Sequence, residues 1–229
     1  MNQKYFFATL CALLICSANF VSAGTIIKLG FSADSRDDFE FTDGVLSTFD
    51  DEFAATLGEQ NTEVTFLGVL DTLTPIERDR ASFTLNGVTA VGSPTVIGVT
   101  LLQPTAGGEF KLYGPSNDLL LAGTLGEGTL SGPIGGPATG GFLTTRFGVF
   151  TGGSLMTTLD GADLSQASFS ISLIDVNQGD GLSLGTQGEL LPFTADATAI
   201  IGGQVQTPEP GSLVLLGLGL LGLCGLRRR

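Results

Sequence analysis

The stretch ASFTLNGVTAV, residues 81–91, is the part of the sequence that decides the fold. Apolar and polar residues alternate on both sides of Asn86 and Gly87, which is typical of strands that bury one face. Asn-Gly readily adopts positive φ, as a two-residue hairpin turn requires. Residues 81–85 and 88–91 are therefore predicted to form a β-hairpin around Asn86-Gly87.

Similar short strands, separated by turn residues, continue on both sides of this stretch. They are predicted at residues 25–31, 64–70, 95–102, 110–113, 119–122, 142–150, 155–159, 167–175, 182–184, 190–193 and 194–201. The glycine-rich segment 123–141 is interpreted as one irregular loop or edge strand. Many short strands at a spacing of about 8–12 residues indicate an all-β fold, an antiparallel β-sandwich or a jelly-roll-like domain.

The acidic segment 34–63 is the least strand-like part of the chain. Val45, Phe49, Phe53 and Leu57 recur at the spacing of one helical face, so residues 45–57 are predicted to form a short helix or a loop anchored on the core. The acidic runs 34–38 and 50–52 are interpreted as solvated loops.

The amino end has the pattern of a secretory signal peptide. Lys4 supplies the positive charge, residues 6–16 form the apolar core, and Val21-Ser22-Ala23 is a small-residue cleavage site. Residues 1–23 are therefore predicted to be a signal peptide, and residues 24–206 an exported domain. All three cysteines lie outside that domain, so it is expected to fold without disulfides.

The exported domain is strongly acidic. It carries six basic and twenty-two acidic residues, a formal charge of −16. Phosphate backbones would be repelled, so no nucleic-acid partner is expected. An acidic surface favours solubility outside the cell and a weak affinity for divalent cations.

Residues 207–229 end in an apolar segment followed by a basic cluster. The apolar run begins at Leu213 and ends at Leu226, and residues 211–226 carry no charge. As a helix, this segment would span about 24 Å, somewhat less than the ~30 Å hydrocarbon core, and snorkelling arginines with local thinning can supply the rest. Arg227, Arg228 and Arg229 predict a cytoplasmic carboxy terminus and a single membrane anchor with everything before it outside.

The tripeptide Pro208-Glu209-Pro210 precedes the apolar run and keeps the chain extended. This tripeptide, the hydrophobic helix and the arginine cluster together resemble the PEP-CTERM protein-sorting signal of certain bacteria. The resemblance covers about a tenth of the chain. One departure is Thr207, where relatives often carry a small apolar residue.

The resemblance implies recognition by exosortase, a membrane protease-transpeptidase that cuts near the tripeptide. The protein would then be exported, tethered in the inner membrane, and finally moved to the cell surface or the extracellular space. Proteins with this signal are commonly associated with exopolysaccharide and with biofilm or floc formation. The implied partners are exosortase, the secretion machinery, the membrane and an extracellular polysaccharide, and the implied role is in the envelope or extracellular matrix.

The composition removes several kinds of catalysis. The chain contains no histidine, and the exported domain contains no cysteine, which excludes Ser-His-Asp and Cys-His arrangements and the usual zinc sites. A non-enzymatic protein without a cofactor is expected. The alternatives are a glycan- or calcium-dependent binding module and, with less support, a secreted hydrolase that uses two carboxylates. The absence of tryptophan disfavours a stacked sugar site.

One loop resembles a calcium-binding sequence. Asp175, Asn177 and Asp180 place oxygen ligands close together, but one extra residue puts Gly179 where a further ligand is needed. Asp, Asn and Gly are also favoured in tight turns. A turn is the preferred interpretation of this loop, and a weak calcium site is the alternative.

Overall fold

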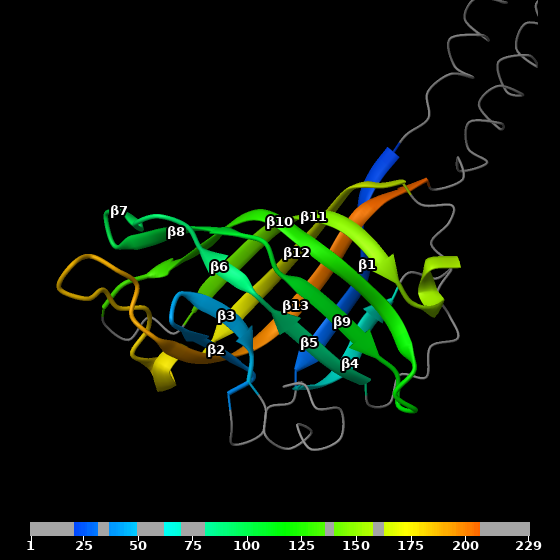
Figure 1. The fold of residues 1–229 in the computed structure, drawn as a ribbon, viewed down its shortest axis with the longest axis horizontal. Coiled ribbons are helices and arrows are strands. Elements are labelled where there is room, and N and C mark those ends of the chain that lie inside the picture. Colours follow the sequence, from blue (N-terminus) through cyan, green and yellow to red (C-terminus); the bar gives the residue numbers. More distant parts are fainter. Residues whose placement is uncertain are drawn as a thin grey trace, which may run out of the picture.

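The computed structural model describes residues 21–31, 37–49, 62–69, 81–135, 140–157 and 163–206. Within these ranges the protein is all-β and antiparallel, as predicted, and its strands form one 13-stranded sheet (Figure 1). The two helical segments described are short 3₁₀ turns, η2 (Ser154–Thr157) and η3 (Val176–Gly179).

The described strands are numbered in the order of the chain. They are β1 (Val21–Phe31), β2 (Phe39–Thr42), β3 (Val45–Thr48), β4 (Thr62–Val69), β5 (Ala81–Asn86), β6 (Val88–Ala90), β7 (Thr95–Ile97), β8 (Thr100–Ala106), β9 (Glu109–Tyr113), β10 (Leu119–Pro133), β11 (Gly141–Gly152), β12 (Asp163–Ile174) and β13 (Phe193–Gln206).

The sheet closes on itself in the order of the sequence. β1 and β2 both pair with β13, β3 and β4 pair with β6 and β5, and β8 and β9 both pair with β10. The strands in β1–β2, β3–β4, β5–β6 and β8–β9 each run one after the other along the same neighbours, so each set can be counted as one long, interrupted strand. Counted in this way, neighbours in the sheet are also neighbours in the chain, and the pairing of β1 with β13 closes the sheet. The predictions of a β-sandwich and of a jelly roll are therefore both wrong, because a sandwich needs two separate sheets and a jelly roll needs strands that cross over to non-sequential partners.

The predicted hairpin at Asn86-Gly87 is also wrong. β5 and β6 continue in one direction along β9 and β8, so Gly87, with a φ of 75°, is a kink inside a long strand path. The nearby hairpin instead joins β7 to β8 at Gly98-Val99, where Gly98 has a φ of 65° and Ile97 pairs with Thr100. That turn lies inside the predicted strand 95–102, where the β-branched residues hid it.

Three other sequence predictions change in the structure. Residues 45–48 of the predicted helix form strand β3, and residues 50–61 lie outside the described ranges. The predicted strand 155–159 overlaps the 3₁₀ turn η2. The first part of the glycine-rich segment, residues 123–133, belongs to strand β10. Gly128 lets β10 lie close to β11, since a Cβ at this position would be 2.6 Å from the carbonyl oxygen of Thr144.

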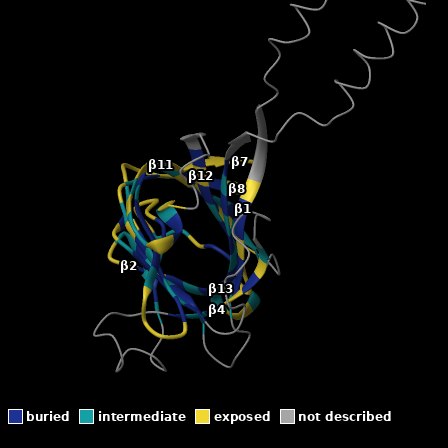
Figure 2. Cartoon of the chain, turned by 90° about the vertical axis from the view of Figure 1, so that its right-hand side faces the viewer, coloured by how far each residue is buried: buried dark blue, intermediate teal, exposed yellow. Residues whose placement is uncertain are grey.

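The interior of the closed sheet is filled by phenylalanine and aliphatic side chains. Phe110 stacks on Phe169 with ring centroids 5.7 Å apart, and Phe83 stacks on both, at 6.1 and 6.0 Å. Buried residues alternate with intermediate or exposed ones along most strands, and exposed residues also occupy turns (Figure 2). The core therefore runs through the middle of the sheet and leaves the two ends for loops.

Side chains form hydrogen bonds in the gap between the pair β1–β4 and the pair β2–β3, where backbone pairing is interrupted. Asp38, 4% exposed, accepts hydrogen bonds from the Ala197 amide (3.2 Å) and the Thr62 hydroxyl (2.6 Å). The Thr48 hydroxyl accepts from the Leu85 amide at 3.1 Å and donates to its carbonyl at 3.3 Å. The interpretation of the whole acidic run 34–38 as solvated is thus wrong at Asp38, which replaces backbone pairing in this gap.

Within the described residues, no helix is long and apolar enough to cross a membrane. The predicted anchor between Leu213 and Leu226, the arginine cluster and most of the predicted signal peptide lie outside those residues. Residues 21–23 of the predicted signal peptide belong to β1.

Candidate functional site

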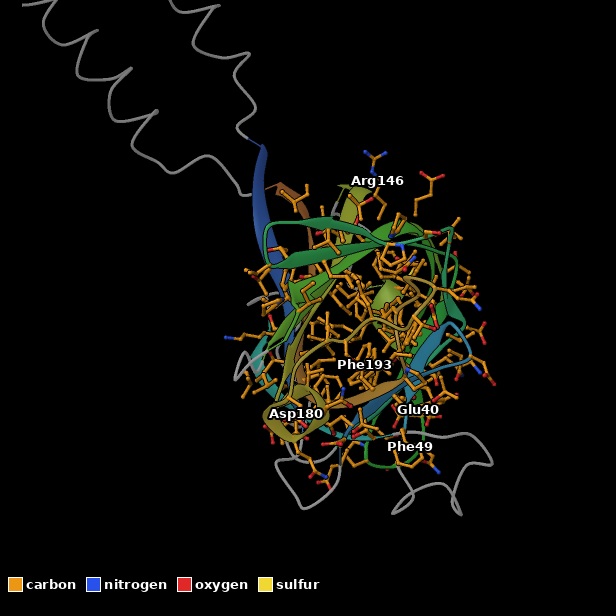
Figure 3. All side chains as sticks on the ribbon, turned by 90° about the vertical axis from the view of Figure 1, so that its left-hand side faces the viewer. Glu40, Phe49, Arg146, Asp180 and Phe193 are labelled. Carbon is orange, nitrogen blue, oxygen red and sulfur yellow. The ribbon has the colours of Figure 1, made fainter. Side chains whose placement is uncertain are left out.

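A concavity lies at the end of the sheet where β13 begins. It has a volume of about 540 Å³, within the range of small-molecule sites. The β2–β3 turn, the segment after β6 and the loop 187–192 contribute its walls. Figure 3 faces this end of the molecule, with Phe193 inside the closed sheet and Glu40 and Asp180 near its rim.

The first wall is a tight turn formed by Asp43 and Gly44. Thr42 pairs with Val45, and both turn residues have positive φ, 53° and 79°. An Asp-Gly pair in this conformation is a standard two-residue hairpin turn. The Asp43 carboxylate is thereby held at the rim, where it is exposed.

The second wall is the loop that carries Glu189. The amide of Gly185 donates to the Glu189 carbonyl at 2.8 Å, and the amide of Gly188 donates to the Gly185 carbonyl at 3.0 Å. The Glu189 carboxylate accepts a hydrogen bond from the backbone N–H of Gln187 at 3.0 Å. These bonds fix the loop, and the carboxylate of the exposed Glu189 lies so close to Gly185 that a Cβ there would clash with Oε1.

The floor is formed by buried side chains from β8 and β2. Gln103, 1% exposed, donates from Nε2 to the carbonyls of Pro104, Gly92 and Val91 at 2.9, 3.3 and 3.4 Å. Phe41 stacks on Phe193 with centroids 5.3 Å apart. The amide and the ring are therefore fixed before any ligand arrives.

The concavity combines acceptors and apolar surface without a cation. Asp43, Glu189, Ser93, Gln103 and Gln187 supply polar groups, and none of the lining residues is basic. Such a lining suits hydroxyl-rich neutral molecules, because carboxylates and amides bond hydroxyl groups, and it disfavours anions.

The predicted calcium loop is a tight turn packed on β13. The Asn177 side chain donates to the Gly181 carbonyl at 3.1 Å and accepts from the Thr194 amide at 3.4 Å. Asp175 and Asp180 lie in the same turn and are exposed. The described ranges contain no group of three acidic, histidine or cysteine side chains arranged to hold a metal. A calcium site formed by Asp175, Asn177 and Asp180 stays a prediction.

The opposite end of β13 leads to the tail. Val21 pairs with Gln206 and Ala23 with Gln204, so the beginning of β1 and the end of β13 lie side by side (Figure 1). β13 has 14 residues, which at about 3.3 Å per residue spans about 43 Å. The concavity and the start of the tail therefore lie at opposite ends of one strand.

Sequence reasoning missed the concavity, although one signal for it was present. Asp43-Gly44 between alternating residues is a strong hairpin signal, but the helical spacing of residues 45–57 drew the prediction away from it. Nothing in the sequence indicates that Glu189 and Gln103, far apart in the chain, share one cavity with Asp43.

Residues 206–229 match the PEP-CTERM protein-sorting motif, which confirms the predicted resemblance. The motif includes Pro208, Glu209 and Pro210 and begins at the last residue of β13. It supports a protein that is exported and sorted by exosortase. No curated protein and no solved structure matches the chain.

Proposed function

We propose that this chain is a non-enzymatic protein of the envelope or extracellular matrix, delivered by exosortase and associated there with exopolysaccharide. The observation that carries the proposal is the sorting motif at residues 206–229, which follows directly on the last strand. Lack of histidine and of cysteine in residues 24–206 supports the non-enzymatic part.

The arrangement of the ends fits delivery from a membrane. The motif leaves the closed sheet at the end opposite the concavity, about 43 Å away along β13 at about 3.3 Å per residue. A domain held by its tail would therefore present the β2–β3 turn and the loop 187–192 outward.

Substitution of the tripeptide tests this proposal. In an exosortase-bearing host, the full chain should reach the surface or the medium, whereas a variant with Pro208→Ala and Glu209→Ala should stay uncut in the inner membrane. Glu127→Ala, which changes an exposed acid on β10, is the control and should behave as the unchanged chain. Equal delivery of the tripeptide variant would contradict the proposal.

A second candidate function is the binding of a neutral saccharide in the concavity. It is supported by the two carboxylates, the exposed side-chain amide of Gln187 and the absence of basic lining residues. Leu190, Pro94 and Pro192 provide apolar surface for the C–H faces of a sugar in place of an aromatic platform. The polysaccharide implied by the sorting signal would be the source of such a ligand.

Titration of the full chain with neutral mono- and oligosaccharides tests this second candidate. Glu189→Gln or Asp43→Asn should weaken binding about tenfold, as expected for loss of a charge-assisted hydrogen bond. Glu127→Gln should leave binding unchanged. Absence of binding, or binding insensitive to both lining variants, would contradict it, and a response to calcium alone would indicate an ion site instead.

A further inference from the structure

Exposed apolar side chains gather on the β7–β8 hairpin and in the segment that leads into it. Ile97 is 64% exposed, Val99 69%, Val91 49% and Val96 39%, and these four residues are named the hairpin patch. All are β-branched, and all lie within 91–99. Half of the large hydrophobic side chains that are exposed among the described residues therefore lie in this hairpin or in the segment that leads into it.

Strand β7 is an edge of the sheet. Among the described residues it pairs with β8, at Thr95–Leu102 and Ile97–Thr100, and stands last in the strand order. On the side of the sheet where β7 has no neighbour, β3 pairs with the preceding strand β6, at Val88 and Thr89, and does not extend to β7. The outer side of β7 therefore offers backbone groups for pairing with another strand.

The hairpin carries no charge to protect this edge. Residues 87–108 contain no charged residue, although the whole chain has a formal charge of −13. Pro94 precedes β7, and within the strand there is neither a proline nor a charge. Lysine and inward-pointing charges often protect edge strands, and β7 has neither; its short length and Pro94 limit the pairing to a few residues.

We propose that the hairpin patch pairs with the hairpin patch of a second copy of this chain. Charge selects this occupant: two molecules of the same strong negative charge repel except where they meet without charge, and the hairpin is such a place. A cationic partner would instead be drawn to the acidic surface. Edge-to-edge pairing of two identical antiparallel strands also generates a two-fold axis, which closes the contact at a dimer.

The interface is small and the association is weak. β7 has three residues, so the pairing buries less than the roughly 1,200 Å² of the smallest stable interfaces. Weak pairing of this kind becomes substantial when many copies are held at high density on one surface, where the effective concentration is high.

Cysteine crosslinking of the full chain tests the proposal. Ile97→Cys is introduced after Cys11, Cys16 and Cys224, the only natural cysteines, have all been replaced by serine. Leu67→Cys and Val149→Cys, whose natural residues are 57% and 59% exposed, serve as matched controls elsewhere on the sheet. A short bis-maleimide should give a crosslinked dimer at position 97 at least roughly fivefold above either control, as edge pairing requires.

A second substitution distinguishes specific pairing of two β7 strands from crosslinking by random encounters between copies. Val99→Asp in the Ile97→Cys chain should abolish the dimer through repulsion between copies, while Val149→Asp should leave it. Equal crosslinking at all three cysteines, no crosslinking at 97, or a dimer that survives Val99→Asp would overturn the proposal, and capture of position 97 by lipid would assign the patch to a membrane instead. The readout does not depend on whether the tail is cut, so it is independent of the proposed sorting.

Discussion

Asp38 shows how much one side chain contributes to this fold. It lies at the point where β13 exchanges β1 for β2 as its neighbour, since Thr198 pairs with Gly30 and Ala195 with Phe39. Its carboxylate accepts the amide of Ala197 between those two pairs. The neighbouring Asp37 accepts from the Thr194 hydroxyl, so the two adjacent acids directly before β2 both bond to β13.

Asp38→Asn should lower the free energy of unfolding by about 1–3 kcal/mol, because one of the two bonds to Ala197 and Thr62 is lost in a buried site. Chemical denaturation measures the change. Asp43→Asn is the control: Asp43 is exposed at a φ of 53°, which asparagine also tolerates, so its effect should stay within about 0.5 kcal/mol. Equal effects of the two substitutions would contradict this role of Asp38.

Asn177→Ala separates the turn from the calcium site. Because the Asn177 side chain bridges Gly181 and Thr194, its loss should lower the melting temperature by several degrees, equally with millimolar calcium and with chelator. A calcium-induced rise in the melting temperature that disappears in the variant would instead support an ion bound by Asp175, Asn177 and Asp180.

At the scale of single residues, the sequence predicted local turns better than the burial of individual side chains. It placed Asp175, Asn177 and Asp180 in one turn, and the structure puts them there. It treated Asp38 as a solvated residue, because burial of an acid depends on partners such as Ala197 that are distant in the chain. The sequence around Glu189 does not indicate that this residue lies near Asp43 and Gln103 in one concavity.

At the scale of elements, paired kinks shape the longest strand paths. Gly87 interrupts the path of β5 and β6, and Gly107 and Gly108 interrupt that of β8 and β9 directly opposite. Both paths bend together and remain paired on both sides of the kink. A Cβ at 87 would lie 3.9 Å from the Gly108 Cα, whereas a Cβ at 108 would lie 2.6 Å from a methyl group of Val88.

The two glycines should therefore differ when replaced by alanine. Gly87→Ala should cost about 1–2 kcal/mol of unfolding free energy, because a φ of 75° is unfavourable for alanine but space is available. Gly108→Ala should cost distinctly more, since its φ of 106° is combined with the contact to Val88. Thermal or urea unfolding measures both, and an equal or smaller cost at 108 would contradict this account of the kink.

Strand existence was more predictable than strand connection. Alternating residues correctly located the strands around 64–70, 110–113 and 167–175, since burial on one face leaves a local pattern. Asn86-Gly87 has the same local signature in a hairpin turn and in a kinked strand. The choice between them depends on β9 and β8, which lie beyond the local sequence, so the hairpin prediction failed.

At the scale of the whole molecule, the closed sheet separates two tasks. β13 links the concavity at Phe193 to the beginning of the sorting motif at Gln206. The hairpin patch adjoins the concavity through residues 92–94, which line it and lead into β7. A molecule fixed by its tail would therefore hold the concavity and the hairpin patch away from the membrane, toward ligands and other copies.

The sorting motif could be predicted from the sequence because its parts are contiguous and its chemistry is carried by composition alone. An all-β antiparallel class could be predicted for a similar reason. The closure of β1 on β13 and the concavity could not, because both depend on contacts between the two ends of the domain.

The mass of the intact protein recovered from the cell surface or the medium tests the central claim most directly. The account predicts a chain without residues 1–23 that ends near Pro210 and has lost Arg227, Arg228 and Arg229, alone or joined to a surface molecule. A surface protein whose mass still includes the apolar run and the three arginines would contradict it.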